Sequence, residues 1–205
     1  MPSENNKTRI YIWNPMTERT GKISRYKTCG HVAVKTDDPD AYYSLWPIFP
    51  KEQGDGFFSG IPFTFQESYE DDCDADKGEG RPADVIICLY TLDGDEIAEK
   101  SDQILQNKFI GWSAKGTTKE ASCASFARQI LEAGGFGELA SLGFSSSLKK
   151  YSSITPGDMR KLAISAKKQE LTKHPETKDF ECPGETPIKT EDTVKSENTG
   201  GCLMM

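Results

Sequence analysis

Histidine is nearly absent from this chain, which has only His31 and His174 among its 205 residues. Two histidines this far apart are too few for the common zinc patterns, and the six cysteines include no C-x-x-C repeat. We therefore expect no structural metal. His174 lies in a polar stretch just before Pro175, where a rigid catalytic position is not expected. If the chain uses a histidine as a base, that residue is His31.

The chain also lacks an excess of positive charge and any long apolar run. Its net charge of −7 and its pI near 5.0 argue against nucleic-acid binding, which needs concentrated positive charge. Met1–Lys7 is polar, so we expect neither a signal peptide nor a membrane span, and a reducing cytosol as the setting. The 36% of hydrophobic residues suffices for one core. We expect a monomer with a single domain over residues 1–172 and a flexible acidic tail over residues 173–205.

Cys123 is placed where a helix should begin. Ser122 is a good N-cap and Gly134 a good C-cap, and apolar residues recur between them at helical spacing. The pattern predicts a buried helix over Cys123–Ala133. The free N–H groups and the dipole at its start favour the thiolate form, and a thiolate is a strong nucleophile. The alternative is that Cys123 is a small core residue, as most buried cysteines are.

A base and an acid for this thiol lie on predicted strands. His31 is in the β-like run Lys27–Lys35, which would present it to a cleft, although a strand histidine can also be purely structural. A carboxylate is needed to orient the imidazole. Asp84 is the best candidate, because it opens the apolar run Ala83–Tyr90; the alternative is a residue of a turn at the strand end.

The remaining pattern indicates an α+β fold with a mostly antiparallel sheet. Strands are predicted at Thr8–Trp13 (an edge strand), His31–Lys35, Tyr42–Trp46 and Ala83–Tyr90 (a central strand), and helices at Asp95–Leu105, Cys123–Ala133 and Pro156–Leu171. Gly54–Gly80 is predicted as a long loop, partly mobile at Glu70–Gly80, that covers the cleft. Its aromatic residues would line an acyl-chain groove or form a satellite hydrophobic cluster.

The order of these motifs resembles permuted papain-fold cysteine enzymes of the NlpC-like kind. The motifs are Gly30-His31-Val32-Ala33-Val34, Tyr43-Ser44-Leu45-Trp46-Pro47, the acid-led strand, Cys123-Ala124-Ser125-Phe126 and Gly134-Gly135, within residues 8–168. The first two look most like Rho-inactivation-domain toxins and related bacterial effectors, which are lysine Nε-fatty acyltransferases with a Cys-His-Asp triad. The resemblance implies a permuted papain-like fold with Cys123 as nucleophile, His31 as base and Asp84 as orienting acid. Ser122 departs from the asparagine that relatives often carry there, which weakens the inference about the substrate.

The C-terminal tetrapeptide fits the rule for prenylation. Cys202-Leu203-Met204-Met205 is a C-a-a-X sequence with a methionine that favours farnesylation, after the polar stretch Ser196–Gly201. The alternative is a chance tetrapeptide on a disordered tail. Prenyltransferases of this kind are eukaryotic, so with the resemblance we expect a bacterial effector that a host enzyme prenylates at Cys202. Its place would be the cytosolic face of host membranes.

One lipid chain holds a protein on a membrane only weakly, so a second signal is expected. The tail is not polybasic. Cys182 is either palmitoylated or, more simply, an exposed thiol. The densest basic stretch, from Lys149 to Lys173, would touch anionic lipid or form an ordinary solvated surface.

The resemblance therefore implies transfer of a fatty acyl group to lysines of membrane-associated host proteins such as small GTPases. Acyl-CoA would be a co-substrate, and no bound cofactor is expected. One alternative is a cysteine protease or amidase with the same triad, because a thiol nucleophile serves either reaction. Another is a prenylated adaptor without catalytic activity.

Overall fold

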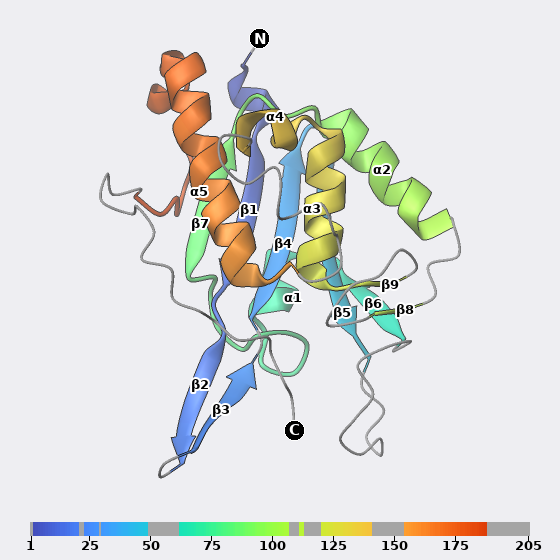
Figure 1. The fold of residues 1–205 in the computed structure, drawn as a ribbon. Helices are drawn as coiled ribbons and strands as arrows, with labels where there is room; N and C mark the ends of the chain where they lie inside the picture. The colour runs from blue at the N-terminus through green and yellow to red at the C-terminus, as the bar shows by residue number, and fades with distance from the viewer. Residues whose placement is uncertain are drawn as a thin grey trace.

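A computed structural model describes the fold of residues 2–20, 23–28, 30–48, 62–106, 111–112, 120–140 and 154–187. A five-stranded sheet forms its centre, and helices cover one of its faces (Figure 1). The strand order is β6 (Phe63–Gln66), β5 (Asp40–Pro47), β4 (His31–Asp37), β1 (Thr8–Trp13) and β7 (Val85–Leu89). Every neighbouring pair in this sheet is antiparallel. The predicted α+β class with a mostly antiparallel sheet is thus confirmed.

The places of two strands differ from the prediction. β1 was expected at an edge, yet it lies between β4 and β7, whereas the expected central strand β7 ends the sheet. A continuous apolar run indicates that both faces of a strand are buried, but it does not indicate whether the strand lies at the centre or at the edge of the sheet. β7 is buried because helix α5 (Pro156–Lys173) packs on it and the segment after α5 follows its outer side.

The helices begin and end at recognisable caps. In helix α3 (Cys123–Ala133), as predicted, Ser122 and Ser125 form a reciprocal capping box. Thr155 and Asp158 do the same for α5. The other helices are α1 (Tyr69–Cys73), α2 (Gly94–Gln106) and α4 (Phe136–Ala140), with 3₁₀ turns at Glu4–Asn6 and Pro175–Asp179. The small sheets comprise a hairpin of β2 (Met16–Thr20) and β3 (Ile23–Thr28), which projects from the body (Figure 1), and a parallel pair of β8 (Gly111–Trp112) and β9 (Glu120–Ala121).

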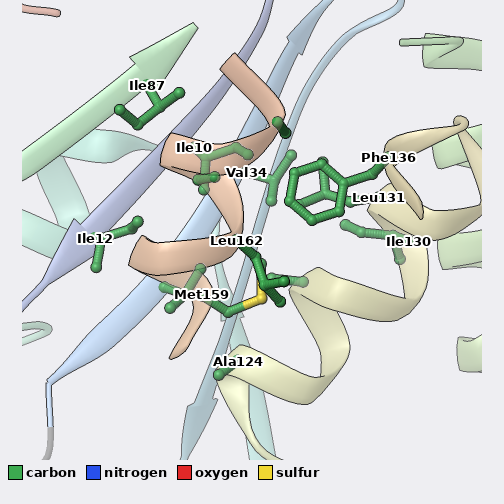
Figure 2. Packing of buried hydrophobic residues seen from close by; sticks show 14 of the residues in the cluster. Ile10, Ile12, Val34, Ile87, Ala124, Ile130, Leu131, Phe136, Met159 and Leu162 are labelled. Carbon is green, nitrogen blue, oxygen red and sulfur yellow. The ribbon is translucent and has the colours of Figure 1, made fainter. Parts of the chain in front are cut away.

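The main hydrophobic core lies between the sheet and the helices. Alternate strand residues such as Ile10, Val34 and Ile87 face α3 and α5, where Ala124 and Met159 meet them (Figure 2). On the opposite face of the sheet a smaller cluster forms around Tyr11, Trp13 and Ala33, and α1 covers it. The sheet therefore has a thick layer of helices on one side and a thin aromatic layer on the other.

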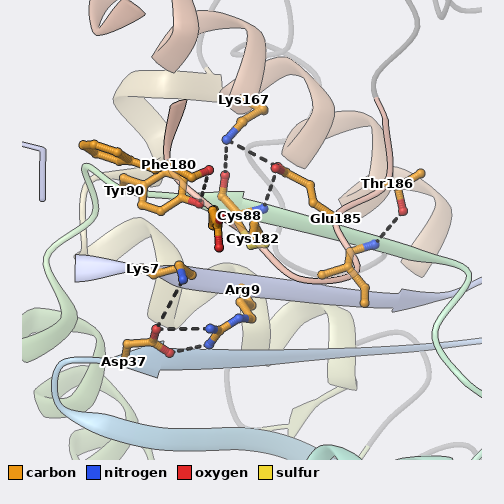
Figure 3. Close-up of a disulfide and its surroundings, with 12 residues drawn as sticks. Lys7, Arg9, Asp37, Cys88, Tyr90, Lys167, Phe180, Cys182, Glu185 and Thr186 are labelled. Carbon is orange, nitrogen blue, oxygen red and sulfur yellow. Dashed lines mark hydrogen bonds and ion pairs between the residues drawn. A yellow bond between two sulfur atoms is a disulfide. The ribbon is translucent and has the colours of Figure 1, made fainter. Parts of the chain in front are cut away.

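The chain after α5 is fastened to β7. Cys182 is joined to Cys88 of β7 by a disulfide, the Thr186 hydroxyl accepts a hydrogen bond from the Ile86 amide, and Glu185 accepts one from the Cys88 amide (Figure 3). The Thr186 amide also donates to the carbonyl of Ile86. Residues 180–187 are called the strap below. The described chain therefore continues in packed form past residue 172, where we predicted the tail to begin. The prediction that Cys182 is an exposed thiol is wrong.

The basic stretch and the long loop also differ from expectation. Lys167 was grouped with surface charges that could meet lipid, but it is 5% exposed and contacts the Cys88 carbonyl and Glu185 (Figure 3). Residues 70–80 were predicted to be mobile, yet they include part of α1 and the fully buried Asp72. Phe63 and Phe65, predicted to lie in the loop, belong to strand β6 and pack against the main core, so they form neither a loop nor a satellite cluster. Phe57, Phe58 and Ile61 lie outside the described residues.

Candidate active site

The two residues singled out from sequence meet in the structure. Cys123 opens α3 and His31 opens β4, and the Cys123 side chain lies close enough to the imidazole to raise the pKa of His31. The β4–β5 pairing runs from Asp37 opposite Asp40 to Ala33 opposite Ser44. His31 therefore lies just beyond the last pair of this ladder, where the start of α3 can approach it.

The imidazole of His31 is enclosed by polar and aromatic groups. Its Nε2 atom lies 2.8 Å from the Ser44 hydroxyl and 3.5 Å from a carboxylate oxygen of Asp72. The Trp46 ring stacks on it with centroids 4.2 Å apart, and the Trp13 ring lies 5.4 Å away. Only 2% of the histidine is exposed. The ring is thus fixed in both plane and direction.

Asp72 is the carboxylate of this site, and β5 holds it. Tyr42, Ser44 and Trp46 alternate along β5 and so share one face of the strand. Each donates a hydrogen bond to Asp72: the Tyr42 hydroxyl at 2.5 Å, the Ser44 hydroxyl at 2.8 Å and the Trp46 indole N–H at 2.5 Å. Three donors allow a fully buried carboxylate to stay ionised, because they replace the water it has lost.

The charges of the site stabilise one another. Burial lowers the pKa of His31, but the charge of Cys123 and the hydrogen bonds with Asp72 and Cys123 outweigh it and raise this pKa to about 9. Burial raises the pKa of Asp72, yet His31, Tyr42 and Trp46 together hold it below its ordinary value. The arrangement favours an imidazolium beside the Asp72 carboxylate at neutral pH.

Asp84 does not take the role predicted for it. Its carboxylate pairs with Arg81 at 2.7 Å and accepts the Asn14 amide at 2.6 Å, so it joins the start of β7 to the end of β1. The carboxylate beside His31 belongs to Asp72, twelve positions earlier in the chain. An acidic residue at the start of a strand often belongs to a turn or an ion pair. The contacts of Asp84 fit that alternative.

Sequence reasoning missed Asp72, Ser44, Tyr42 and Trp46. A signal for the helix that carries Asp72 was present, because Ser68 caps α1 by accepting the Asp71 amide. A signal for its partners was present too, in three hydrogen-bond donors at alternate positions of a predicted strand. Neither signal indicates which acidic residue accepts the hydrogen bonds of these donors.

The start of α3 can contribute to the chemistry. The Ser122 hydroxyl accepts the Ser125 amide and the Ser122 carbonyl accepts the Phe126 amide. The preceding amides of the first turn, those of Cys123 and Ala124, have no partner within the helix and are the ones suited to an oxyanion. A nucleophile, a base, an orienting acid and an oxyanion site are the parts that acyl transfer through a thiol requires.

One other cluster has the composition of a metal site. Cys88, Cys182 and Glu185 bring their ligand atoms within 4.8 Å of one another. The two sulfurs are joined as a disulfide, however, and the Lys167 ammonium lies 3.3 Å from the carboxylate. A disulfide offers no thiolates and the ammonium repels a cation, so this group does not suit a metal ion.

No helix in the described part of the chain has the length and apolarity needed to span a bilayer. The predicted prenylation site, Cys202, lies outside the described residues. No family model matches the chain, and neither a curated protein nor a solved structure shows significant similarity to it.

Proposed function

We propose that this chain is a thiol acyltransferase that moves a fatty acyl group from acyl-CoA to lysines of membrane-associated proteins such as small GTPases. The observation that carries the proposal is the buried imidazole of His31 between the Cys123 side chain and Asp72. Acyl-CoA as donor and lysine as acceptor rest on the resemblance of the His31, Ser44–Trp46 and Cys123 motifs to Rho-inactivation-domain effectors. A permuted papain-like arrangement belongs to the same proposal.

The first half-reaction would acylate Cys123. The thiolate attacks the thioester carbonyl of acyl-CoA, and the first-turn amides of α3 stabilise the oxyanion. When the intermediate collapses, the bond to the CoA sulfur breaks and the protonated His31 gives its proton to that sulfur. The products are free CoA, a neutral His31 and an acyl thioester on Cys123.

The second half-reaction would transfer the acyl group to the acceptor. A neutral lysine amine attacks the thioester carbonyl, and His31 takes the proton that the amine loses. The bond to the Cys123 sulfur then breaks, which restores the thiolate and the imidazolium. The amide product is stable, whereas water in place of lysine would give a hydrolase, so access of the amine decides the reaction.

Membrane attachment through Cys202 would bring enzyme and acceptor onto one surface. Confinement of both partners raises their encounter rate without any new contact between them. We place the prenylated protein on the cytosolic face of host membranes, as a bacterial effector that a host prenyltransferase modifies. The state of the Cys88–Cys182 pair then depends on the compartment, because a disulfide persists outside the cell and is reduced in the cytosol.

Intact-protein mass spectrometry tests the proposed reaction. The wild-type chain is incubated with palmitoyl-CoA and a lysine-rich, prenylated small GTPase. We expect a hydroxylamine-sensitive palmitoyl adduct on the chain and a hydroxylamine-resistant adduct on the GTPase. Cys123→Ala should lose both adducts, and so should His31→Ala, because His31 takes part in both half-reactions.

Cys73→Ala is the matched control, since Cys73 is the other free cysteine among the described residues. It should retain both adducts. A shortened GTPase without an adduct would indicate a protease instead, and an unmodified GTPase would contradict transfer to this acceptor. In cell fractionation, Cys202→Ser should move the chain from membranes to the soluble fraction, and unchanged fractionation would remove the prenylation proposal.

A further inference from the structure

We infer that Ser44 is a positioning residue of this site: its hydroxyl group bridges Asp72 and His31 and transmits the effect of the carboxylate to the imidazole. The inference rests on the proposed role of His31 as the base of Cys123. It adds a fourth member, in the order Cys123, His31, Ser44, Asp72.

The direction of the hydrogen bonds follows from the single proton of the hydroxyl. Ser44 Oγ donates that proton to Asp72 Oδ1 at 2.8 Å, so its contact of 2.8 Å with His31 Nε2 must be one in which the ring donates. The direct distance from Nε2 to Asp72 Oδ2 is longer, at 3.5 Å. The nearest acceptor of the imidazole proton is therefore the serine oxygen.

The surrounding donors hold the Asp72 carboxylate where it can accept the hydrogen bond of Ser44. The Tyr42 hydroxyl donates to Oδ2, the oxygen that also lies nearest to His31 Nε2, and the Trp46 indole shares Oδ1 with Ser44. Ser44 is fully buried, so no water competes for its hydroxyl. With the proton held on Nε2, Nδ1 is the ring nitrogen that can exchange a proton with Cys123.

Two ionisable groups face His31 among the described residues: Cys123 from α3 and Asp72 from α1. The neighbouring Trp13 and Trp46 rings carry no charge at any accessible pH. Only Asp72 acts through Ser44, so the contributions of the two charges can be separated by substitution. Removing the Ser44 hydroxyl weakens the link to Asp72 and leaves the thiol in place.

The first test needs no change at Ser44. The ¹⁵N NMR spectrum of Cys123→Ala, in which the neutral form of His31 is easier to reach, reports which ring nitrogen carries the proton. Because the chain has two histidines, the signals can be assigned with His174→Gln. We expect the Nε2–H form, and an Nδ1–H form would overturn the inference.

The second test compares three variants in the full-length protein. Ser44→Ala should weaken proton binding by His31 about tenfold, because a hydrogen bond to a charged group is lost. The titration of the His31 NMR signal reports this change. Iodoacetamide alkylation of Cys123, located by peptide mass spectrometry, should slow in parallel. Ser44→Thr keeps the hydroxyl and should restore both values, while Tyr42→Phe keeps the bridge and should have the smaller effect.

A wild-type His31 titration in Ser44→Ala would overturn the inference, and so would a failure of Ser44→Thr to restore it in a folded protein. A purely structural role would lower the melting temperature without moving the titration. None of these measurements needs an acyl donor. Their outcome can therefore be distinguished from a failure of acyl transfer itself. If transfer is found, Ser44→Ala should lower kcat and leave KM unchanged.

Discussion

At the scale of single residues, the site depends on buried charges that compensate one another. His31 and Asp72 are both almost completely removed from water, and their side chains lie 3.5 Å apart. Removal of one partner from such a pair leaves the other buried without compensation, which is strongly destabilising. Substitutions here therefore need a stability measurement beside every activity measurement.

The raised pKa of His31 links stability to pH. The folded value of about 9 lies above the ordinary 6.5, so the stabilisation is complete below pH 6.5 and is lost as pH rises through 9. By linkage it amounts to about 3 kcal/mol. We expect urea unfolding to show this loss between pH 6.5 and pH 9.5 in the wild type and not in His31→Gln. His174→Gln is the control and should behave as wild type; an equal pH dependence in all three proteins would contradict the prediction.

The two candidate acids should respond differently to the same change. Asp72→Asn removes the negative charge that stabilises the imidazolium, and we expect kcat for acyl transfer to fall by about 100-fold or more. Asp84→Asn alters an exposed contact with Arg81 and should leave kcat near the wild-type value. Steady-state kinetics of both variants, with melting temperatures, checks this pair. A larger loss in Asp84→Asn would return the role of orienting acid to that residue.

The pairing of Cys123 with His31 could be predicted from local patterns, and the position of Asp72 beside them could not. Ser122 and Gly134 limit a helix in any sequence context, and the scarcity of histidine leaves His31 as the natural base. The position of Asp72 depends on tertiary structure, because α1 has only five residues and lies within an acidic, glycine-rich stretch. Several carboxylates there are equivalent in sequence, and only the donors on β5 distinguish one of them.

At the scale of elements, prediction succeeded where local signals decide the structure. β1 and α3 have the predicted limits, and α5 is two residues longer than predicted. The order of strands in a sheet depends on which elements cover each edge, and sequence periodicity contains no such information. This is why the positions of β1 and β7 were exchanged.

The contact between α2 and α3 depends on a glycine. A Cβ atom on Gly134 would lie 2.7 Å from Ile97 Cγ1 and 2.8 Å from the Asp93 carbonyl oxygen. We expect Gly134→Ala to lower the free energy of unfolding by about 1–3 kcal/mol, because the packed neighbours must move. Gly137→Ala, in α4 with nothing within 4 Å of the added carbon, is the matched control and should be neutral or stabilising. Chemical denaturation of both variants measures the difference, and equal stabilities would contradict this packing.

At the scale of the whole molecule, the disulfide fixes the strap to the sheet. Cys88 and Cys182 are 94 positions apart, and closing a loop of that size reduces the entropy of the unfolded chain. We expect Cys182→Ser to lower the free energy of unfolding by about 4 kcal/mol under oxidising conditions. Urea unfolding with and without a reductant measures this, and the reduced wild type should resemble the variant.

Cys73→Ser serves as the control, because Cys73 is not part of a disulfide. The free energy of unfolding of Cys73→Ser should differ from that of the wild type by a small amount, and this difference should be the same with or without a reductant. If reduction changes the wild type no more than it changes Cys182→Ser, the bond contributes nothing and the polar contacts of the strap suffice.

The strap also bears on how this protein behaves at high concentration. β7 is the last strand of its sheet, and without Thr186 and Glu185 the amides of Ile86 and Cys88 would have no acceptor on that side. An uncovered strand edge pairs readily with the same edge of another molecule. Covering it keeps neighbouring molecules from joining their sheets, so the reduced protein should aggregate sooner than the oxidised protein as its concentration rises.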